Sequence, residues 1–300
     1  MRTKSGRISA NSLKLFAAIF VVLSLLCSVS FAATEPIKVM SFNIRYGDAK
    51  DGTNGWQFRK ELVLQTIKVF DPDLLGMQEV LYYQGEYLRT NLPAYGFYGV
   101  GREDGVRKGE FAPVLYKTNR FEAIKTGHFW LSETPEVAGS KSWDSSLPRI
   151  CTYVLLKDKV ANRTILYANT HLDHIGKVAR AESAKLIRKK FAEFEEKYPV
   201  ILTGDFNATE DTDTYKNLIE SGNKKWIDSF RVIHFVKTPY EASFHGWKGG
   251  WSGERIDWIL HTPDLTTVNS MIDYTSDEGR HPSDHYPVEA VIRYSHNLNN

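Results

Sequence analysis

Cysteine is scarce in this chain, since Cys27 and Cys151 are the two cysteines among 300 residues. A zinc site formed by several cysteine thiolates is therefore excluded. If the N-terminal segment discussed below is removed, Cys151 remains alone and no intrachain disulfide can form. We expect stability to come from a hydrophobic core, which a chain of 300 residues, 42% of them hydrophobic, is long enough to build.

Internal repeats, low-complexity tracts and a linker rich in proline, glycine and serine are also absent from the sequence. A linker of that kind usually marks a boundary between domains. Apolar runs of strand type and helix type are instead mixed along the whole chain after residue 33. We therefore predict one compact α/β domain over residues 33–300, with glycine-rich loops at 99–109 and 247–253.

Acidic residues are missing from the first 32 positions, which contain four basic residues and a dense apolar run from Leu15 to Leu26. Ser30 and Ala32 then place small residues at the two positions that a signal peptidase reads. This layout predicts a cleaved signal peptide at residues 1–32 and a secreted or periplasmic protein. The alternative is an anchor that is kept, because the apolar stretch is nearly long enough to span a bilayer.

A strong net charge is lacking as well. The chain has 38 Lys and Arg against 36 Asp and Glu, and loss of four basic residues with positions 1–32 leaves 34 against 36, a net charge of −2. Without a positive field over the whole protein, strong non-specific binding to nucleic acid is not expected. A local basic groove, for which Arg102, Arg107 and Lys108 are candidates, would still permit a nuclease.

The apolar pattern predicts a chain that mixes strands and helices. Runs typical of buried strands cover residues 37–44, 73–80, 111–117, 150–156, 164–170, 199–203, 255–261 and 286–294. Helical spacing covers residues 59–70 and, most clearly, residues 175–197. The apolar side of the second helix is expected to contain Val178, Leu186, Ile187, Phe191 and Phe194.

Polar residues stand at the ends of several of these apolar runs. Side chains mounted on rigid strand ends are well placed to form a site. Taken singly, each has a structural explanation, such as a buried asparagine that bonds to backbone. The functional alternative is a metal-assisted site, because carboxylate and amide oxygens suit a hard cation such as Mg²⁺. The residues concerned are Asn43, Glu79, His171, Asp205, Asn207, Asp257 and Asp284.

Two of these segments suggest specific chemistry. Asp205 and Asn207 follow the run 200–204, and their i, i+2 spacing points both side chains to one side, where they could orient a water molecule. Asp257 lies within an apolar strand and needs a partner, for which a histidine is suited. Paired with a carboxylate, His285 would have a raised pKa and could act as a base or as a donor to a phosphate.

Taken together, these motifs resemble the endonuclease/exonuclease/phosphatase superfamily, the metal-dependent fold of pancreatic-type deoxyribonuclease and the nocturnin-like deadenylases. The resemblance implies a four-layer α/β-sandwich, in which two packed mixed β-sheets are flanked by helices. It places the chain near a bacterial exported branch that is similar to the nocturnin-like group. Seven motifs occur in the family order: Ser41-Phe42-Asn43, Gln78-Glu79, Gly109-Glu110-Phe111, Asn169-Thr170-His171, Gly204-Asp205-Phe206-Asn207, Arg255-Ile256-Asp257 and Ser283-Asp284-His285.

The resemblance also implies a metal site and a water-activating pair. Glu79 would be the principal ligand of Mg²⁺, for which Mn²⁺ could substitute. Asn43 would lie beside it, and Asp284 would belong to the same metal or phosphate neighbourhood. Asp205 would orient or deprotonate the attacking water, and Asn207 would position that water or hold the phosphate.

Two carboxylate–histidine pairs across the phosphate are a further implication of the resemblance. Asp257 would orient His285, and Glu110 would orient His171. The substrate-binding residues that it implies are Arg149, Tyr116 and His245.

Substrate class is the point that the sequence leaves open. A phosphatase or phosphodiesterase for a small phosphorylated metabolite, sugar or lipid headgroup is favoured modestly by the slightly acidic mature chain and by the aromatic loop around Trp247 and Trp251. An exported nuclease acting on DNA or RNA is the close alternative, and a non-catalytic binding module is the distant one. We expect a monomer that does not stay inserted in a membrane after signal cleavage.

Overall fold

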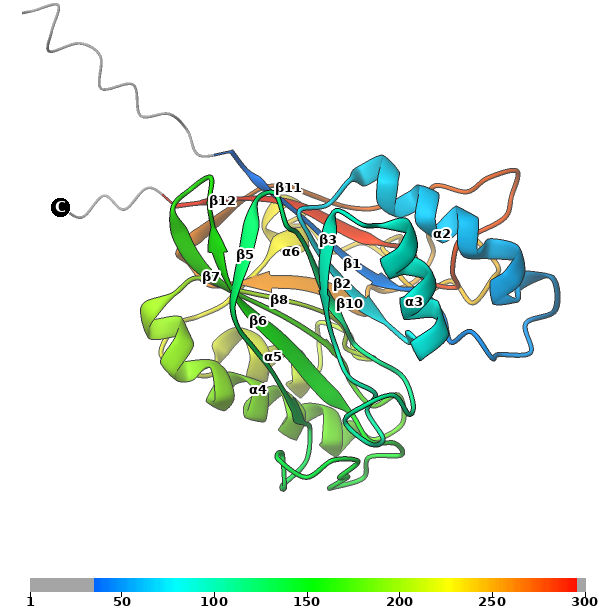
Figure 1. Ribbon diagram of the computed structural model, residues 1–300. Coiled ribbons are helices and arrows are strands. Elements are labelled where there is room, and N and C mark those ends of the chain that lie inside the picture. The colour runs from blue at the N-terminus through cyan, green and yellow to red at the C-terminus, as the bar shows by residue number, and fades with distance from the viewer. Residues whose placement is uncertain (1–34, 296–300) are drawn as a thin grey trace, which may run out of the picture. The chain divides into compact units, whose positions relative to one another are not determined.

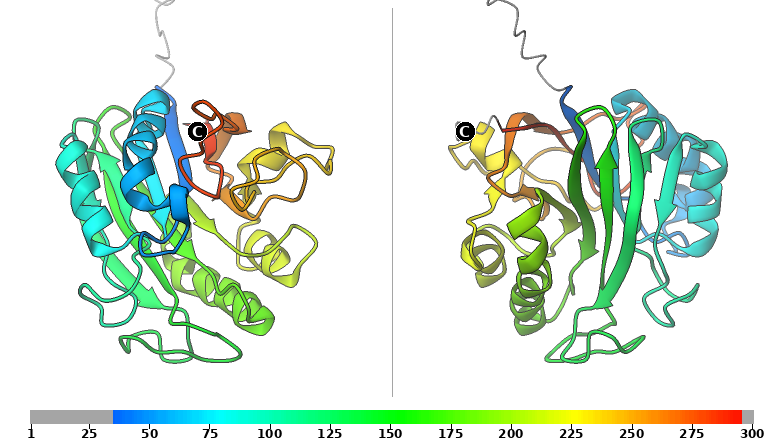
Figure 2. Two further views of the ribbon diagram at one scale, coloured as in Figure 1. Left: turned by 90° about the vertical axis from the view of Figure 1, so that its right-hand side faces the viewer. Right: turned by 60° about the vertical axis from the view of Figure 1, so that its left-hand side comes forward.

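Two six-stranded sheets frame residues 35–295, which are the residues that this computed structural model describes. The strand order is β11-β12-β1-β2-β4-β3 in the first sheet and β5-β6-β7-β8-β10-β9 in the second. Helices cover the outer faces (Figures 1 and 2), so the predicted four-layer α/β-sandwich is confirmed. The predicted signal peptide at 1–32 lies outside the described residues.

The first sheet consists of β1 (Ile37–Asn43), β2 (Leu74–Gln78), β3 (Tyr95–Tyr98), β4 (Val114–Lys117), β11 (Leu265–Ile272) and β12 (Val288–Tyr294). The second consists of β5 (Phe121–Trp130), β6 (Ile150–Asp158), β7 (Arg163–His171), β8 (Val200–Asp205), β9 (Ile227–Asp228) and β10 (Asp257–His261). The helices are η1 (Gly52–Asn54), α2 (Trp56–Phe70), α3 (Tyr82–Asn91), α4 (Lys177–Lys197), α5 (Asp213–Glu220) and α6 (Ser229–Ile233).

Each sheet has one parallel strand pair at its centre. β1 runs parallel to β2 with α2 as the crossover, and β7 runs parallel to β8 with α4 as the crossover. The other pairs between named strands are antiparallel. Carboxyl ends of parallel strands share one edge of a sheet, and the register there sets Asn43 beside Gln78 and His171 beside Asp205.

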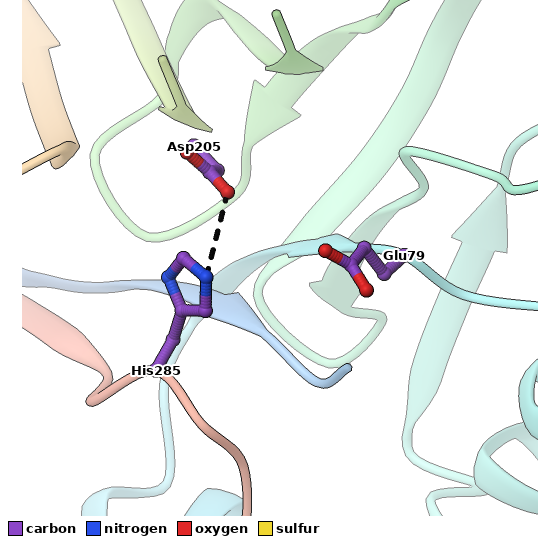
Figure 3. A group of neighbouring side chains, drawn as sticks. All are labelled: Glu79, Asp205 and His285. Atoms are coloured by element: carbon purple, nitrogen blue, oxygen red, sulfur yellow. Dashed lines mark ion pairs between the residues drawn. The ribbon is translucent and has the colours of Figure 1, made fainter. Parts of the chain in front are cut away.

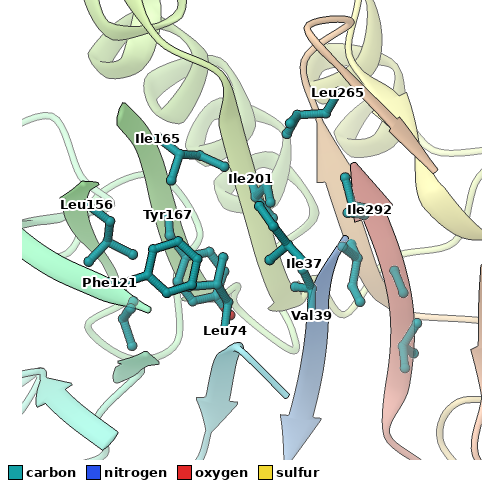
Figure 4. Packing of buried hydrophobic residues seen from close by; sticks show 14 of the residues in the cluster. Ile37, Val39, Leu74, Phe121, Leu156, Ile165, Tyr167, Ile201, Leu265 and Ile292 are labelled. Carbon is teal, nitrogen blue, oxygen red and sulfur yellow. The ribbon is translucent and has the colours of Figure 1, made fainter. Parts of the chain in front are cut away.

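The hydrophobic core has three parts because both faces of each sheet are covered. Ile37 and Val39 of β1 face Tyr167 and Ile201 of the second sheet (Figure 4), whereas Met40, next along β1, packs under α2 and α3. This alternation follows the two-residue period of a strand. A third cluster joins α4 and α5 to the second sheet. Burial of each large apolar side chain stabilises the fold by roughly 1.5–3 kcal/mol.

A buried polar seam fixes the position of one sheet against the other. Gln78 Nε2 donates to Asn169 Oδ1 (2.7 Å), and Asn169 Nδ2 donates to the carbonyls of Met77 (2.6 Å) and Pro113 (3.0 Å). Gly76 makes room for this contact, since a Cβ there would lie 2.1 Å from Thr203 Oγ1. Because buried polar groups lose free energy when unpaired, the seam selects one register between the sheets.

All the strands and both helices expected from the apolar pattern are present, with ends shifted by a few residues. One assignment on α4 is wrong: Val178 is 54% exposed, while Ile187 and Phe191 are buried as expected. Within the described residues, no helix has the length and apolar content needed to cross a membrane.

Candidate active site

Polar side chains from both sheets converge at the edge where the two parallel pairs end. Glu79 follows β2, Asp205 ends β8, and His285 precedes β12. One ligand-type atom from each lies within 4.8 Å of the others (Figure 3). They open into a cavity of about 400 Å³. The residues expected from the sequence that line it are Glu79, Glu110, Arg149, His171, Asp205, Asn207, Asp284 and His285.

Three residues at the cavity have left-handed backbone conformations that non-glycine residues rarely adopt. The φ angles are 61° at Arg45, 61° at Glu79 and 47° at Asn207. Such a conformation costs on the order of 1–3 kcal/mol and persists only where neighbours hold it. Here the backbone N–H of Asn207 donates to Asp205 Oδ1 (2.9 Å), and that of Tyr46 donates to Glu79 Oε2 (2.7 Å). Strain of this kind is typical of functional sites.

Asn43 links the carboxylates from behind the cavity. Its Nδ2 donates to Glu79 Oε1 (3.1 Å) and to Asp205 Oδ2 (2.9 Å), whereas its Oδ1 accepts from the Arg45 N–H (3.0 Å). The side chain is fully buried. In this orientation the amide nitrogen, not the oxygen, faces the two carboxylates and holds them close together.

The His285–Asp257 pair has the expected geometry. His285 Nδ1 lies 2.9 Å from Asp257 Oδ2, and both residues are buried. Burial alone would lower the pKa of His285, but the charges of Asp257 and Asp205 and the hydrogen bond to Asp257 raise it to about 10. The imidazole is therefore positively charged at neutral pH, with Nε2 3.7 Å from Asp205 Oδ2.

Asp205 lies between charges of both signs. Burial and the charge of Asp257 raise its pKa to about 7, although His285 and hydrogen bonds from Asn207 and Asn43 oppose this change. A carboxylate with a pKa near 7 can both accept and release a proton at neutral pH, which suits a general base.

His171 and Glu110 form a looser pair than the resemblance implies. His171 Nδ1 lies 3.7 Å from Glu110 Oε2, beyond hydrogen-bond distance, because Arg102 holds both oxygens of that carboxylate at 2.7 and 2.9 Å. On its other side, His171 Nε2 is 3.0 Å from Asn207 Nδ2. Burial and the charge of Arg149 keep the pKa of His171 well below its usual value. The two histidines therefore differ in charge.

Arg149 lines the cavity and keeps one buried donor unpaired. Its Nε is 3.4 Å from Asp173 Oδ2 and its Nη2 is 2.9 Å from His174 Nδ1, but its Nη1 has no partner among the described residues. Asp173 also accepts hydrogen bonds from the loop at 145–147 and from the turn before α4. A guanidinium with an unpaired N–H matches a phosphate oxygen.

Arg45 is a cavity residue that the sequence analysis missed. Its guanidinium makes two hydrogen bonds to Asp51 (2.9 and 3.0 Å), and its Nη1 lies 3.5 Å from Asp284 Oδ2. The signal that could have revealed it is its position two residues after Asn43, just beyond the end of β1.

Arg59 of α2 ties together the loops that carry the site. Its guanidinium donates to the carbonyls of Ile44 (2.5 Å), Arg45 (3.0 Å), Pro282 (3.0 Å) and Asn54 (2.9 Å). Burial lowers the pKa of Arg59 to about 10. Two of these carbonyls flank Asn43 and Asp284, so this buried cation fixes both ends of the carboxylate cluster.

The structure does not bring Tyr116 or His245 into the cavity. Tyr116 pairs with Leu74 at the start of β2, the end opposite to Glu79, and its ring lies over Gly96. His245 is 7% exposed and stacks on Tyr286 at 4.1 Å, behind the cavity wall.

The donor set fits a hard divalent cation. The carboxylates of Glu79, Asp205 and Asp284 face one cavity, and burial together with neighbouring negative charge raises the pKa of both aspartates. A cation would relieve this repulsion, and oxygen donors are those that Mg²⁺ prefers. His285 also offers a ring nitrogen within 4.8 Å of ligand oxygens of Glu79 and Asp205.

The chain is similar in sequence and in structure to several known proteins. A sequence model described as the Endonuclease/Exonuclease/phosphatase family matches residues 40–285. The solved endonuclease/exonuclease/phosphatase from Bacteroides vulgatus is 36% identical, with a TM-score of 0.80, and the match covers 87% of this chain and 99% of that one. A mannosyl-6-phosphatase of Bacteroides thetaiotaomicron VPI-5482 is 34% identical, with a TM-score of 0.77, over 86% of this chain and 100% of that one.

A curated relative is more distant. Mouse nocturnin is 27% identical over 307 residues, a match that covers 90% of this chain and 66% of nocturnin. The chain thus spans about two thirds of the length of the nocturnins it matches.

Proposed function

The chain belongs to the endonuclease/exonuclease/phosphatase family, and from this membership we propose a metal-dependent phosphatase that removes phosphate from a small sugar phosphate. Membership confirms the resemblance noted in the sequence and implies hydrolysis of phosphate esters. The observation that carries the finer proposal is a cavity of about 400 Å³ lined both by the carboxylate cluster and by Arg149, whose buried Nη1 has no partner among the described residues. The mannosyl-6-phosphatase relative supports a sugar phosphate as substrate.

Glu79 and Asp284 would hold the metal beside Asp205. Asn43, expected from the sequence as a ligand, would instead position the carboxylates of Glu79 and Asp205, because its amide nitrogen faces them. Mg²⁺ is the cation proposed, and Mn²⁺ is its substitute. When bound, such a cation would polarise a phosphoryl oxygen and stabilise the leaving oxygen.

Side chains of the protein perform the other roles in the proposed hydrolysis. Asp205, with its pKa near 7, takes a proton from water as that water attacks phosphorus in line with the leaving oxygen. Asn207 orients this water through its amide. The charged His285 and the free Nη1 of Arg149 neutralise negative charge that develops on the phosphoryl oxygens. The neutral His171 accepts from Asn207 and fixes that amide.

A nuclease is the second candidate. The observation that favours it is the set of curated relatives, which includes nocturnins and a CCR4-Not 3'-5'-exoribonuclease subunit. These relatives are less similar to the chain than the mannosyl-6-phosphatase is, at 27% and 23% identity against 34%.

A metal-controlled substrate panel tests both candidates. The protein would be treated with chelator, reloaded with Mg²⁺ or Mn²⁺, and offered mannose 6-phosphate, a generic phosphodiester, plasmid DNA and RNA. We expect phosphate release from the sugar ester that returns only with metal. Asp205→Asn should lose at least about 100-fold in kcat, whereas Asp211→Asn, a change of an exposed aspartate, should not. Degradation of plasmid or RNA at enzyme concentrations that leave the sugar phosphate intact would reverse the order of the two candidates.

We also propose export of a monomer after cleavage near residue 32. The basic start, the apolar run and the small residues that follow support this proposal. Mass spectrometry of the N-terminus from fractionated cells tests it: a species beginning near Ala33 in the periplasm or medium is expected, and a full-length species in the membrane fraction would indicate an anchor instead. Sedimentation of the mature protein would show whether it is a monomer.

A further inference from the structure

The wall of the cavity is apolar although its floor is charged. Tyr46, Leu147, Phe244 and Ile256 line the same cavity as the carboxylates and histidines. Phe244 is 47% exposed and Leu147 is 38% exposed. Large apolar groups that stay in contact with water at the mouth of a site are available to a bound ligand.

Phe244 stands beside the reacting groups. The centre of its ring lies 4.9 Å from that of the His285 imidazole, and the two planes meet at 54°. His285, Arg149 and Asp205 line the same cavity as Phe244, and His285 is in contact with its ring. A phosphate bound among these three groups would therefore bring its leaving group within reach of Phe244.

Backbone contacts fix this ring in place. Phe244 and His285 face each other in an antiparallel bridge. On one side Tyr286 N–H donates to Ser243 O (2.7 Å), and on the other His245 N–H donates to Asp284 O (2.9 Å). Ser243 Oγ also accepts from the N–H of Asp257 (3.1 Å). The exposed aromatic face is thus preorganised, which reduces the entropy that a ligand must overcome on binding.

We propose that Phe244 is the leaving-group subsite, and that it stacks against the ring of a sugar phosphate with Leu147 and Ile256 completing the wall. This inference rests on the proposed function and adds a source of selectivity to it. One face of a pyranose carries C–H groups that match an aromatic ring, while its hydroxyls remain free for polar groups and water. An open-chain ester such as glycerol 3-phosphate has no ring and would leave Phe244 exposed.

The test compares Phe244→Ala, Phe244→Tyr and a matched control. Phe235→Ala removes another exposed phenyl ring (84% exposed) that does not line the cavity. Each variant would be assayed with mannose 6-phosphate, glycerol 3-phosphate and a nucleoside monophosphate under the same metal conditions. For Phe244→Ala we expect KM for the sugar phosphate to rise about tenfold, the scale of one aromatic contact with a ring. The kcat of Phe244→Ala for the sugar phosphate, and its kcat and KM for glycerol 3-phosphate, should change less than about threefold.

The aromatic variant Phe244→Tyr should restore most of the sugar selectivity, and Phe235→Ala should match the wild type. Equal losses for sugar and glycerol phosphates would show that Phe244 acts through His285 and would overturn the subsite. A rise in KM with the nucleoside monophosphate alone would show that Phe244 stacks on a nucleobase, and it would also overturn the sugar subsite. If the wild type hydrolyses none of the monoesters, the proposed function falls and the sugar subsite falls with it.

Discussion

Replacement of Arg59 by methionine tests whether this side chain positions the active-site residues in addition to stabilising the fold. The four carbonyls held by Arg59 belong to three loops, and two of these loops carry Asn43 and Asp284. Methionine preserves much of the volume and removes all four donors. We therefore expect both stability and activity to fall.

A second buried arginine provides the matched control. Arg188 of α4 donates to the carbonyls of Leu218 (3.1 Å) and Lys224 (2.6 Å) and stacks on Trp226 at 4.2 Å. Arg59 likewise lies over a tryptophan, Trp56, at 5.3 Å. Both arginines are less than 5% exposed and neither lines the cavity, but only Arg59 bonds to carbonyls next to the site, those of Ile44 and Pro282.

The expected loss of stability is similar for the two variants. A hydrogen bond from a charged group contributes roughly 1.5–3 kcal/mol, and such bonds to one group are not additive. We expect Arg59→Met to lower the free energy of unfolding by ~4 kcal/mol, and Arg188→Met, which also leaves the buried Glu195 without the cation 3.4 Å away, to lower it by at least as much. For a domain of this size, the melting temperature should fall by about 10 °C.

Activity should distinguish the two. At temperatures equally far below the two melting points, Arg59→Met should lose about 100-fold in kcat/KM, since small misplacements of reacting groups have effects of that size. Arg188→Met should stay within about threefold of the wild type. The stabilisation of the folded protein by Mn²⁺, read from the melting temperature, should vanish only in Arg59→Met. Equal activity losses in both variants would refute the idea that Arg59 positions the site.

Three further predictions concern single side chains. Asp257→Asn should return the pKa of His285 from about 10 toward its usual 6.5. The pH–rate profile of this variant should therefore lose activity above about pH 7. An unchanged profile would exclude a charged His285 from the reaction. Asn169→Leu should lower the free energy of unfolding by ~3 kcal/mol in urea melts, because it removes the buried hydrogen bonds that join Asn169 to Gln78 and to the carbonyls of Met77 and Pro113. A neutral result would show that water replaces the seam. Burial and the charge of Asp273 raise the pKa of Glu289 to about 8, so the folded state retains a proton that the unfolded chain releases above about pH 4.5. The free energy of unfolding should therefore fall between about pH 4.5 and 8, and Glu289→Gln should reduce that fall by ~2 kcal/mol. If the free energy of unfolding changes with pH in the same way for variant and wild type, Glu289 is not neutral in the folded protein.

The site residues that lie at strand ends could be predicted because they depend on local sequence patterns. Buried strands give apolar runs, and a polar residue that interrupts such a run is visible without any tertiary information. Asn43, Glu79, His171 and Asp205 were found in this way, and they lie together because parallel strands end at one edge.

The residues that were missed depend on contacts between loops. Nothing local to Arg59 shows that carbonyls at 44 and 282 will surround it, and Arg45 resembles any exposed arginine until Asp51 and Asp284 are placed beside it. Strand β5 was missed because its middle residues are exposed and give no apolar run. Tyr116 was expected as a substrate contact from the family resemblance alone, whereas its position depends on strand register, which pairs it with Leu74 at the start of β2.

The position of β1 has a consequence for when the protein becomes active. The first strand of the described chain lies between β2 and β12, so its sheet cannot close until the last strand has been made. Asp284 and His285 precede that last strand directly. A chain still under synthesis therefore carries Glu79 and Asp205 without the partners that complete the cluster. We therefore expect a chain that lacks β12 and the residues just before it to be inactive, because the cluster is incomplete.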